Sequence, residues 1–373
     1  MRWSLAHVLD AAAPHLDVRL AAPRAQTRAR SLLASLPAAI SDWIYLEFRL
    51  SPRDARIDVI VRVDEAHRHR LACGSPWRRA NAFARMWADP EVGWNRAIEN
   101  LWLEFDLEGA ASDESPHLHE PRFFVDFTSS IRNDPSPDIR WRVACDAIAP
   151  LCPEALPSEV TQSLRRTLHA LPCGASLLSV GLPHGAAMPG LRVCLTGVAT
   201  SDLSSFLRAA GWACDGGGVS EVLHQLFDAP GGAGVIDLVD LDLTSDGRGA
   251  LSIELGFARK PQLRGAIEER HLLERLAACH AIDAASIDAL GAWPGYERAR
   301  LAHVFWPALL VRRINHVKLM FEDGRISGVK AYLCVFHRFS RPIAPRLYSI
   351  DRALDCEVDR FLPDSGTAPA PLA

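Results

Sequence analysis

The sequence predicts an α/β protein: a closed, antiparallel, ten-stranded barrel of five β-hairpins, with helices outside and a solvent-filled lumen. Two observations predict this fold. Strand-length segments occur in pairs that helical patterns separate, and apolar and polar residues alternate within the strands, which gives them a polar face. Helices would cover the apolar faces, and the polar faces would line the interior. Closure removes the exposed sheet edges, and ten strands leave room for a ligand.

The composition is that of a globular chain with a sizeable core, since 49% of the 373 residues are hydrophobic and 23% are charged. The net charge of -4 argues against a nucleic-acid partner. We expect no signal peptide and no membrane span. The nine scattered cysteines indicate reduced thiols and a cytoplasmic protein, and the many Ala and Arg residues favour a bacterial origin. We expect one domain over residues 1–355 and a disordered tail over 356–373.

The five strand pairs follow one another along the chain. Asp246-Gly247 and Asp323-Gly324 supply the positive φ angles that tight hairpins need, and Pro189-Gly190 turns the third pair. The predicted pairs are 43–50 with 57–63, 101–107 with 123–127, 176–180 with 191–198, 235–243 with 250–257, and 314–321 with 329–335.

Helical periodicity fills the segments between these pairs. Ser201 is the expected N-cap of one helix, and Gly211 is its expected end. The apolar helix faces are Ala29, Leu32, Leu33 and Leu36; Val160, Leu164, Leu168 and Leu171; Leu203, Phe206, Leu207 and Ala210; and a long helical region from Leu272 that continues to Leu290.

This arrangement resembles the prenyltransferase barrel, or ABBA fold, of bacterial aromatic, fungal indole and cyanobactin peptide prenyltransferases. The resemblance spans roughly Ala29 to Arg338 and is one of topology, with few motifs. Lys330-Ala331-Tyr332 matches the Lys-x-Tyr pattern with which the family binds a prenyl diphosphate, and Lys318 lies across the same hairpin. Glu47 on the first strand and Arg62 on the second match the indole enzymes, and Arg192 matches a basic residue of a middle hairpin.

The resemblance implies transfer of an isoprenyl group from a prenyl diphosphate to a small-molecule or peptide acceptor, without an organic cofactor. Fixed positive charges would hold the leaving diphosphate, aromatic rings would shield the allylic cation, and a carboxylate would take the acceptor's proton. The candidates are Glu47 and then Glu104 for the base; Arg49, Arg62, Arg192, Lys318, Lys330 and Tyr332 for the diphosphate; and Trp43, Tyr45, Trp102 and Glu254 for the cation or the acceptor.

Two departures from the family leave alternatives open. The chain has only four tyrosines, whereas the indole enzymes shield their cation with many, and Cys194 stands where the tyrosine of a second pattern like Lys-x-Tyr is expected. The predicted inner face is acidic, which fits Mg²⁺ bound by Asp240 and Asp242, or a cationic acceptor.

A second hypothesis is a non-catalytic barrel that binds a peptide or metabolite, and a third is an open sheet with an interaction surface. An enzyme predicts basic residues clustered at one depth of the lumen. A binding barrel predicts basic residues that are dispersed and paired with acids.

Overall fold

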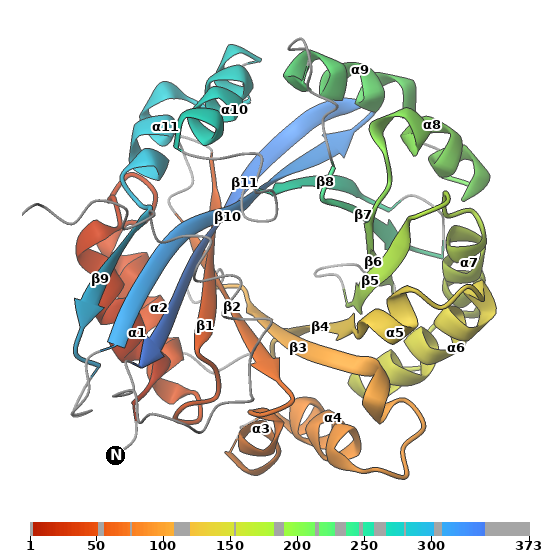
Figure 1. Ribbon diagram of the computed structural model, residues 1–373, viewed down its shortest axis with the longest axis horizontal. Helices are drawn as coiled ribbons and strands as arrows, with labels where there is room; N and C mark the ends of the chain where they lie inside the picture. The colour runs from red at the N-terminus through yellow and green to blue at the C-terminus, as the bar shows by residue number, and fades with distance from the viewer. Residues whose placement is uncertain are drawn as a thin grey trace, which may run out of the picture.

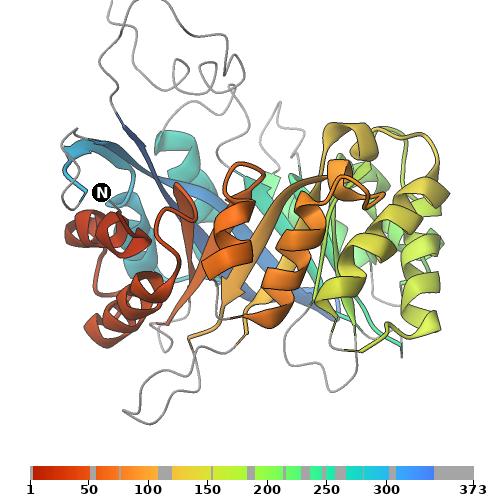
Figure 2. The same cartoon turned by 90° about the horizontal axis from the view of Figure 1, so that it is seen from below.

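The computed structural model describes residues 3–50, 56–74, 77–107, 120–152, 154–182, 190–212, 216–227, 236–245, 249–256, 266–279, 281–301 and 308–339. These residues form a barrel of antiparallel strands that is ringed by helices, as Figure 1 shows down the barrel and Figure 2 from the side. The predicted tail 356–373 and the Asp246-Gly247 turn lie outside the described residues.

Ten strands close the barrel, as predicted. Strand β11 pairs with both β1 and β10, which joins the two ends of the order β11-β1-β2-β3-β4-β5-β6-β7-β8-β10. The strands of the wall are β1 Trp43–Arg49, β2 Ile57–Asp64, β3 Ile98–Phe105, β4 Arg122–Phe127, β5 Ser176–Gly181, β6 Leu191–Thr196, β7 Leu238–Leu243, β8 Leu251–Gly256, β10 Ala308–Glu322 and β11 Arg325–Phe339.

The last hairpin is much longer than predicted. Strands β10 and β11 have 15 residues each, and both continue beyond the positions where apolar and polar residues alternate regularly. They are joined by Asp323 and Gly324, whose φ angles of 48° and 73° confirm the expected tight turn.

An eleventh strand, β9 (Gly295–Ala299), was not predicted. It pairs with Ala308–Arg312 at the start of β10, so it extends the sheet beside the barrel wall. Its residues are half-buried or exposed, and Tyr296 is 61% exposed. The strand buries no apolar face, so its sequence GYERA shows no alternation of apolar and polar residues from which a strand could be predicted.

The helices cover the apolar faces of the strands, as Figure 1 shows. In α4, the residues Ala80, Phe83, Ala84 and Trp87 share one buried face at helical spacing. The helices are α1 Leu5–Ala12, α2 Pro23–Ser35, α3 Arg68–Gly74, α4 Arg78–Ala88, α5 Ser129–Arg132, α6 Pro137–Ile148, α7 Ser158–His169, α8 Thr200–Ala209, α9 Gly216–Phe227, α10 Ala266–Ala278 and α11 Ala284–Gly291.

One prediction about a helix end was wrong, and the predicted long helical region divides into two helices. Helix α8 begins at Thr200 after Ala199, so Ser201 lies in its first turn; the expected end at Gly211 is confirmed by a φ of 80°. The long helical region from Leu272 is two helices, because the Asp283 side chain accepts a hydrogen bond from the backbone N–H of Ser286 and starts α11 there.

None of the helices within the described ranges has both the length and the apolar character that crossing a bilayer requires.

Candidate active site

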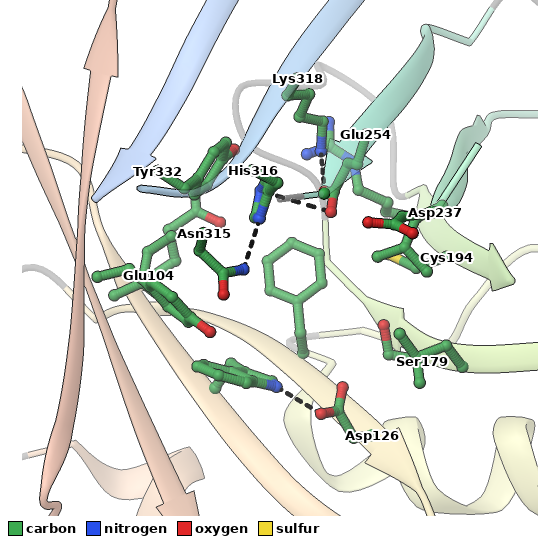
Figure 3. Close-up of a pocket in the computed structure, with 18 residues that line it drawn as sticks. Glu104, Asp126, Ser179, Cys194, Asp237, Glu254, Asn315, His316, Lys318 and Tyr332 are labelled. Atoms are coloured by element: carbon green, nitrogen blue, oxygen red, sulfur yellow. Dashed lines mark hydrogen bonds and ion pairs between the residues drawn. The ribbon is translucent and has the colours of Figure 1, made fainter. Parts of the chain in front are cut away.

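A cavity of about 160 Å³ lies in the barrel lumen. Side chains from most strands of the wall reach it, and Figure 3 shows them converging from opposite sides. Its aromatic lining consists of Tyr45, Trp102, Phe124 and Tyr332. Its polar lining consists of Glu104, Asp126, Ser179, Arg192, Asp237, Glu254, Asn315, His316 and Lys318. The predicted polar lumen is therefore present.

Three of the predicted cationic side chains lie in one row across the wall. Lys318 on β10 is the register partner of Lys330 on β11, and Lys330 is the register partner of Arg49 on β1. Register partners lie side by side, so these three cations lie at a single depth of the barrel. Like charges directly opposite one another on neighbouring strands repel each other, so the row needs negative partners.

Each cation of the row also has a carboxylate partner. Lys330 forms an ion pair with Glu47, and Lys318 forms ion pairs with Asp240 and, at 3.4 Å, with Glu254. Arg49 Nη2 lies 4.0 Å from Asp58 Oδ2. Burial alone would lower the pKa of Lys318, but the charges of Asp240 and Glu254 raise it above its usual value, so Lys318 stays charged.

Glu47 and Asp58 share the lumen wall as register partners on β1 and β2, and they ionise differently. Burial would raise the pKa of Glu47, but the Lys330 charge and a hydrogen bond from Tyr332 lower it to about 2. Burial and the neighbouring Glu47 charge raise the pKa of Asp58 to about 7. Near neutral pH, Glu47 is ionised, whereas Asp58 keeps its proton in part of the molecules.

The base predictions meet an obstacle in these contacts. Glu47 is 2% exposed, lies outside the cavity lining and binds a proton weakly. Glu104 does line the cavity, but its Oε1 lies 2.5 Å from Nη1 of Arg122, which also contacts Asp106 at 3.1 Å. Both base assignments stay predictions.

The two candidate magnesium ligands are occupied by cations. Asp240 is paired with Lys318, and both oxygens of Asp242 contact Arg192, at 2.5 and 2.7 Å. In the part of the chain that the structure describes, no group of three or more His, Cys, Asp or Glu side chains could hold a metal ion. These residues therefore do not fit Mg²⁺ as they are arranged.

Arg62 and Trp43 do not join the row of cations. The Arg62 guanidinium lies 4.8 Å from the centre of the Trp43 ring and 3.8 Å from Asp42. Trp43 also stacks on Phe336, at 4.6 Å between ring centres. Trp43 and Arg49 are at opposite ends of β1, so their backbone positions lie about 20 Å apart along the strand. Arg62, which contacts Trp43, is therefore far from the row of cations.

The aromatic wall next to the cavity is ordered by polar contacts. Tyr45 stacks on Trp102 at 5.3 Å between ring centres, and Trp102 Nε1 donates a hydrogen bond of 2.7 Å to Asp126. Phe124 lies over Gly181, where a Cβ atom would approach the ring to 2.1 Å. The absence of a side chain at Gly181 lets this ring lie against the wall.

Two β-bulges place further residues in the cavity that the sequence did not identify. Regular alternation is interrupted between Leu177 and Ser179 on β5, and between Ile314 and His316 on β10. At each bulge two successive side chains line the cavity: Leu178 with Ser179, and Asn315 with His316. Bulges of this kind re-aim side chains at functional sites. Strict alternation in the sequence cannot predict that two neighbouring residues both face the lumen.

The comparisons with known proteins rest on structure. No protein-family model and no curated protein matches the sequence. The apo form of the prenyltransferase PriB is 17% identical, with a TM-score of 0.50 over 88% of this chain and 94% of that one. A 6-dimethylallyl tryptophan synthase is 15% identical, with a TM-score of 0.50 over 89% and 97%. AnaPT from Neosartorya fischeri is 13% identical, with a TM-score of 0.50 over 92% and 94%. This likeness concerns the fold, and the fold of this chain is the prenyltransferase barrel.

Proposed function

We propose that this protein is a prenyltransferase, which moves an isoprenyl group from a prenyl diphosphate to an aromatic or heteroatom nucleophile of a small molecule or peptide. One observation carries the proposal: the row Lys318, Lys330 and Arg49 adjoins a cavity with aromatic walls inside a closed barrel. Fixed cations stabilise the leaving diphosphate, and electron-rich rings stabilise an allylic cation. Two proteins with a similar fold are a prenyltransferase and a dimethylallyl tryptophan synthase.

The diphosphate is assigned to the row of cations. Lys318 on β10 lines the cavity directly. Arg192 on β6 also lines it, and the two residues are close enough for the Arg192 charge to lower the pKa of Lys318. A diphosphate carries more negative charge than the carboxylates that now hold these cations, so it competes with them for the same ammonium groups. Arg62 lies outside this site and is left out of the assignment.

The size of the cavity favours a short donor. About 160 Å³ is close to the roughly 150 Å³ that accommodates a benzene ring in a protein core. A five-carbon dimethylallyl group has a similar number of atoms, whereas a farnesyl group has fifteen carbons. We therefore expect dimethylallyl diphosphate to be the preferred donor, in a cytoplasmic enzyme without an organic cofactor.

A non-catalytic barrel that binds a metabolite or peptide is the second candidate. The pairing of Lys330 with Glu47, of Lys318 with Asp240 and of Arg192 with Asp242 favours it, because each cation already has a counter-charge. The two candidates make different predictions: only the enzyme consumes a donor.

Transfer is tested by incubating the purified protein with dimethylallyl, geranyl or farnesyl diphosphate and a panel of aromatic and amine acceptors, with and without Mg²⁺. Mass spectrometry should detect an acceptor that has gained one isoprenyl unit, together with released diphosphate. The variant Lys318→Met should abolish both products. Arg165→Met is the matched control, because Arg165 is a surface residue 51% exposed, paired with Asp138 far from the lumen. A folded protein that turns over no donor with any acceptor would support the binding barrel instead.

A further inference from the structure

The proposed transfer requires a group that removes a proton from the acceptor, and three of the carboxylates near the cavity are poorly suited to it. Glu47 lies outside the cavity lining beneath Lys330, and Glu104 is bound to Arg122. Asp126 accepts hydrogen bonds from Trp102 and, at 3.2 Å, from Asn100. A base must be within hydrogen-bond reach of the proton that it takes.

His316 has the surroundings of a base. Its imidazole lines the cavity and stacks face to face on Tyr332, with 4.0 Å between ring centres and an interplanar angle of 27°. Its Nε2 lies 3.4 Å from Oε2 of Glu254, and its Nδ1 lies 2.8 Å from the side-chain amide of Asn315. Figure 3 shows the ring between these two partners, facing the centre of the cavity.

The 2.8 Å contact fits one neutral tautomer, in which the Asn315 amide donates to Nδ1. Nε2 then carries the hydrogen, on the side of the ring that lies 3.4 Å from Glu254. The other oxygen of Glu254 lies 3.4 Å from Lys318, which fixes the carboxylate. A histidine with a carboxylate on one nitrogen and a lone pair on the other is the arrangement that general bases use, because the carboxylate stabilises the imidazolium.

The β-bulge explains how the sequence delivers this ring. Ile314 pairs with Leu333 and His316 pairs with Tyr332, so Asn315 is an extra residue in β10. Without it, alternation from Ile314 would turn His316 and Lys318 to the helix side of the wall. The inserted residue therefore places the base, its hydrogen-bond donor Asn315 and the diphosphate ligand Lys318 in one cavity.

We propose that His316, oriented by Glu254, is the general base of the transfer. The inference rests on the proposed function. In the reaction the bond between C1 of the prenyl group and the diphosphate oxygen breaks, and both electrons leave with the diphosphate. The acceptor's nucleophilic atom forms its new bond to C1, and its proton passes to Nδ1 of His316, where it displaces the Asn315 amide. The imidazolium then returns the proton to water.

The first test is the pH profile of the wild-type protein with dimethylallyl diphosphate and L-tryptophan or another accepted nucleophile. The rate should rise across roughly pH 6 to 8, where an imidazole loses its proton. The charged or titratable groups around the ring are Glu254 on β8, Lys318 on β10, Tyr332 on β11 and Tyr45 on β1. If the wild-type rate does not change over this pH range, the proposal is overturned, and no variant is needed for that conclusion.

The second test compares His316→Gln with His337→Gln. His337 is a buried histidine on β11 that faces the helices and contacts Trp3, with 4.2 Å between ring centres. His316→Gln should lower kcat about 100- to 10,000-fold and leave donor binding within about threefold, while His337→Gln should keep the wild-type kcat. Added imidazole should restore part of the activity of His316→Ala, which loss of a packing contact would not predict.

The outcomes separate this inference from the proposed function. Transfer by the wild-type protein that His316→Gln reduces by less than threefold would exclude His316 as the base and leave the transferase intact. Wild-type kcat in His316→Gln, together with a loss of kcat at unchanged donor binding in folded Glu47→Gln, would assign the base to Glu47 instead. No transfer by the wild-type protein would overturn the proposed function, and the role of His316 with it.

Discussion

The paired carboxylates Glu47 and Asp58 make a prediction about stability. In Asp58→Asn, the amide keeps the acceptor that takes a hydrogen bond of 3.2 Å from the backbone of Leu107, but it carries no charge. Because Asp58 ionises near pH 7 when folded and near 3.8 when unfolded, the unfolded state holds fewer protons between these values. Wild-type stability must therefore fall as pH rises from about 4 to about 7.

The difference between 3.8 and about 7 corresponds to roughly 4 kcal/mol at about 1.36 kcal/mol per pKa unit. Urea unfolding of both proteins at pH 4, 6 and 8 measures the effect. At pH 4 the two free energies of unfolding should agree closely, and at pH 8 Asp58→Asn should be the more stable by about 1–4 kcal/mol. A difference that does not change with pH, or a less stable variant at pH 8, would refute the linkage.

Two further substitutions test the lumen and the wall. Glu47→Gln leaves the Lys330 ammonium without its counter-ion and should lower the free energy of unfolding at pH 7 by about 3 kcal/mol. Urea unfolding measures this change. An unchanged free energy would show that the ion pair does not stabilise the fold. Gly197→Ala forces a φ of 78° on a residue whose Cβ would lie 2.5 Å from the Gly174 carbonyl oxygen. It should lower the melting temperature by several degrees, and a rise would contradict the geometry.

Strand alternation predicts most of the fold because it reports which face of each strand is buried. The apolar face of β1, with Ile44, Leu46 and Phe48, is fully buried under the helices, and Glu47 and Arg49 face the lumen as expected. The same rule fails where the phase changes. His316 and Lys318 share a face with each other, and the extra residue Asn315 turns that face to the lumen, because alternation from Ile314 alone would turn it to the helices.

Alternation also says nothing about depth or about partners. By alternation, Arg62 and Lys330 both belong to the inner faces of their strands. In the structure Arg62 contacts Trp43 at one end of β1, whereas Lys330 pairs with Arg49 at the other end. The stagger between strands sets that depth, and loop geometry determines the stagger. The ion pairs of Asp240 and Asp242 likewise depend on side chains from other strands, so the sequence left open a metal or a cationic partner where the structure has Lys318 and Arg192.

The central claim is that the row of cations binds a prenyl diphosphate, and thermal stabilisation by dimethylallyl diphosphate tests it most directly. A ligand at about 100 times its dissociation constant adds roughly 2.7 kcal/mol to the folded state. The account predicts a concentration-dependent rise in the melting temperature of the wild-type protein. This rise should be lost in Lys330→Ala and in the charge-neutral pair Lys330→Met with Glu47→Gln, and kept in the surface control Arg165→Ala. No rise in a folded wild-type protein, or an equal rise in all four proteins, would contradict the account.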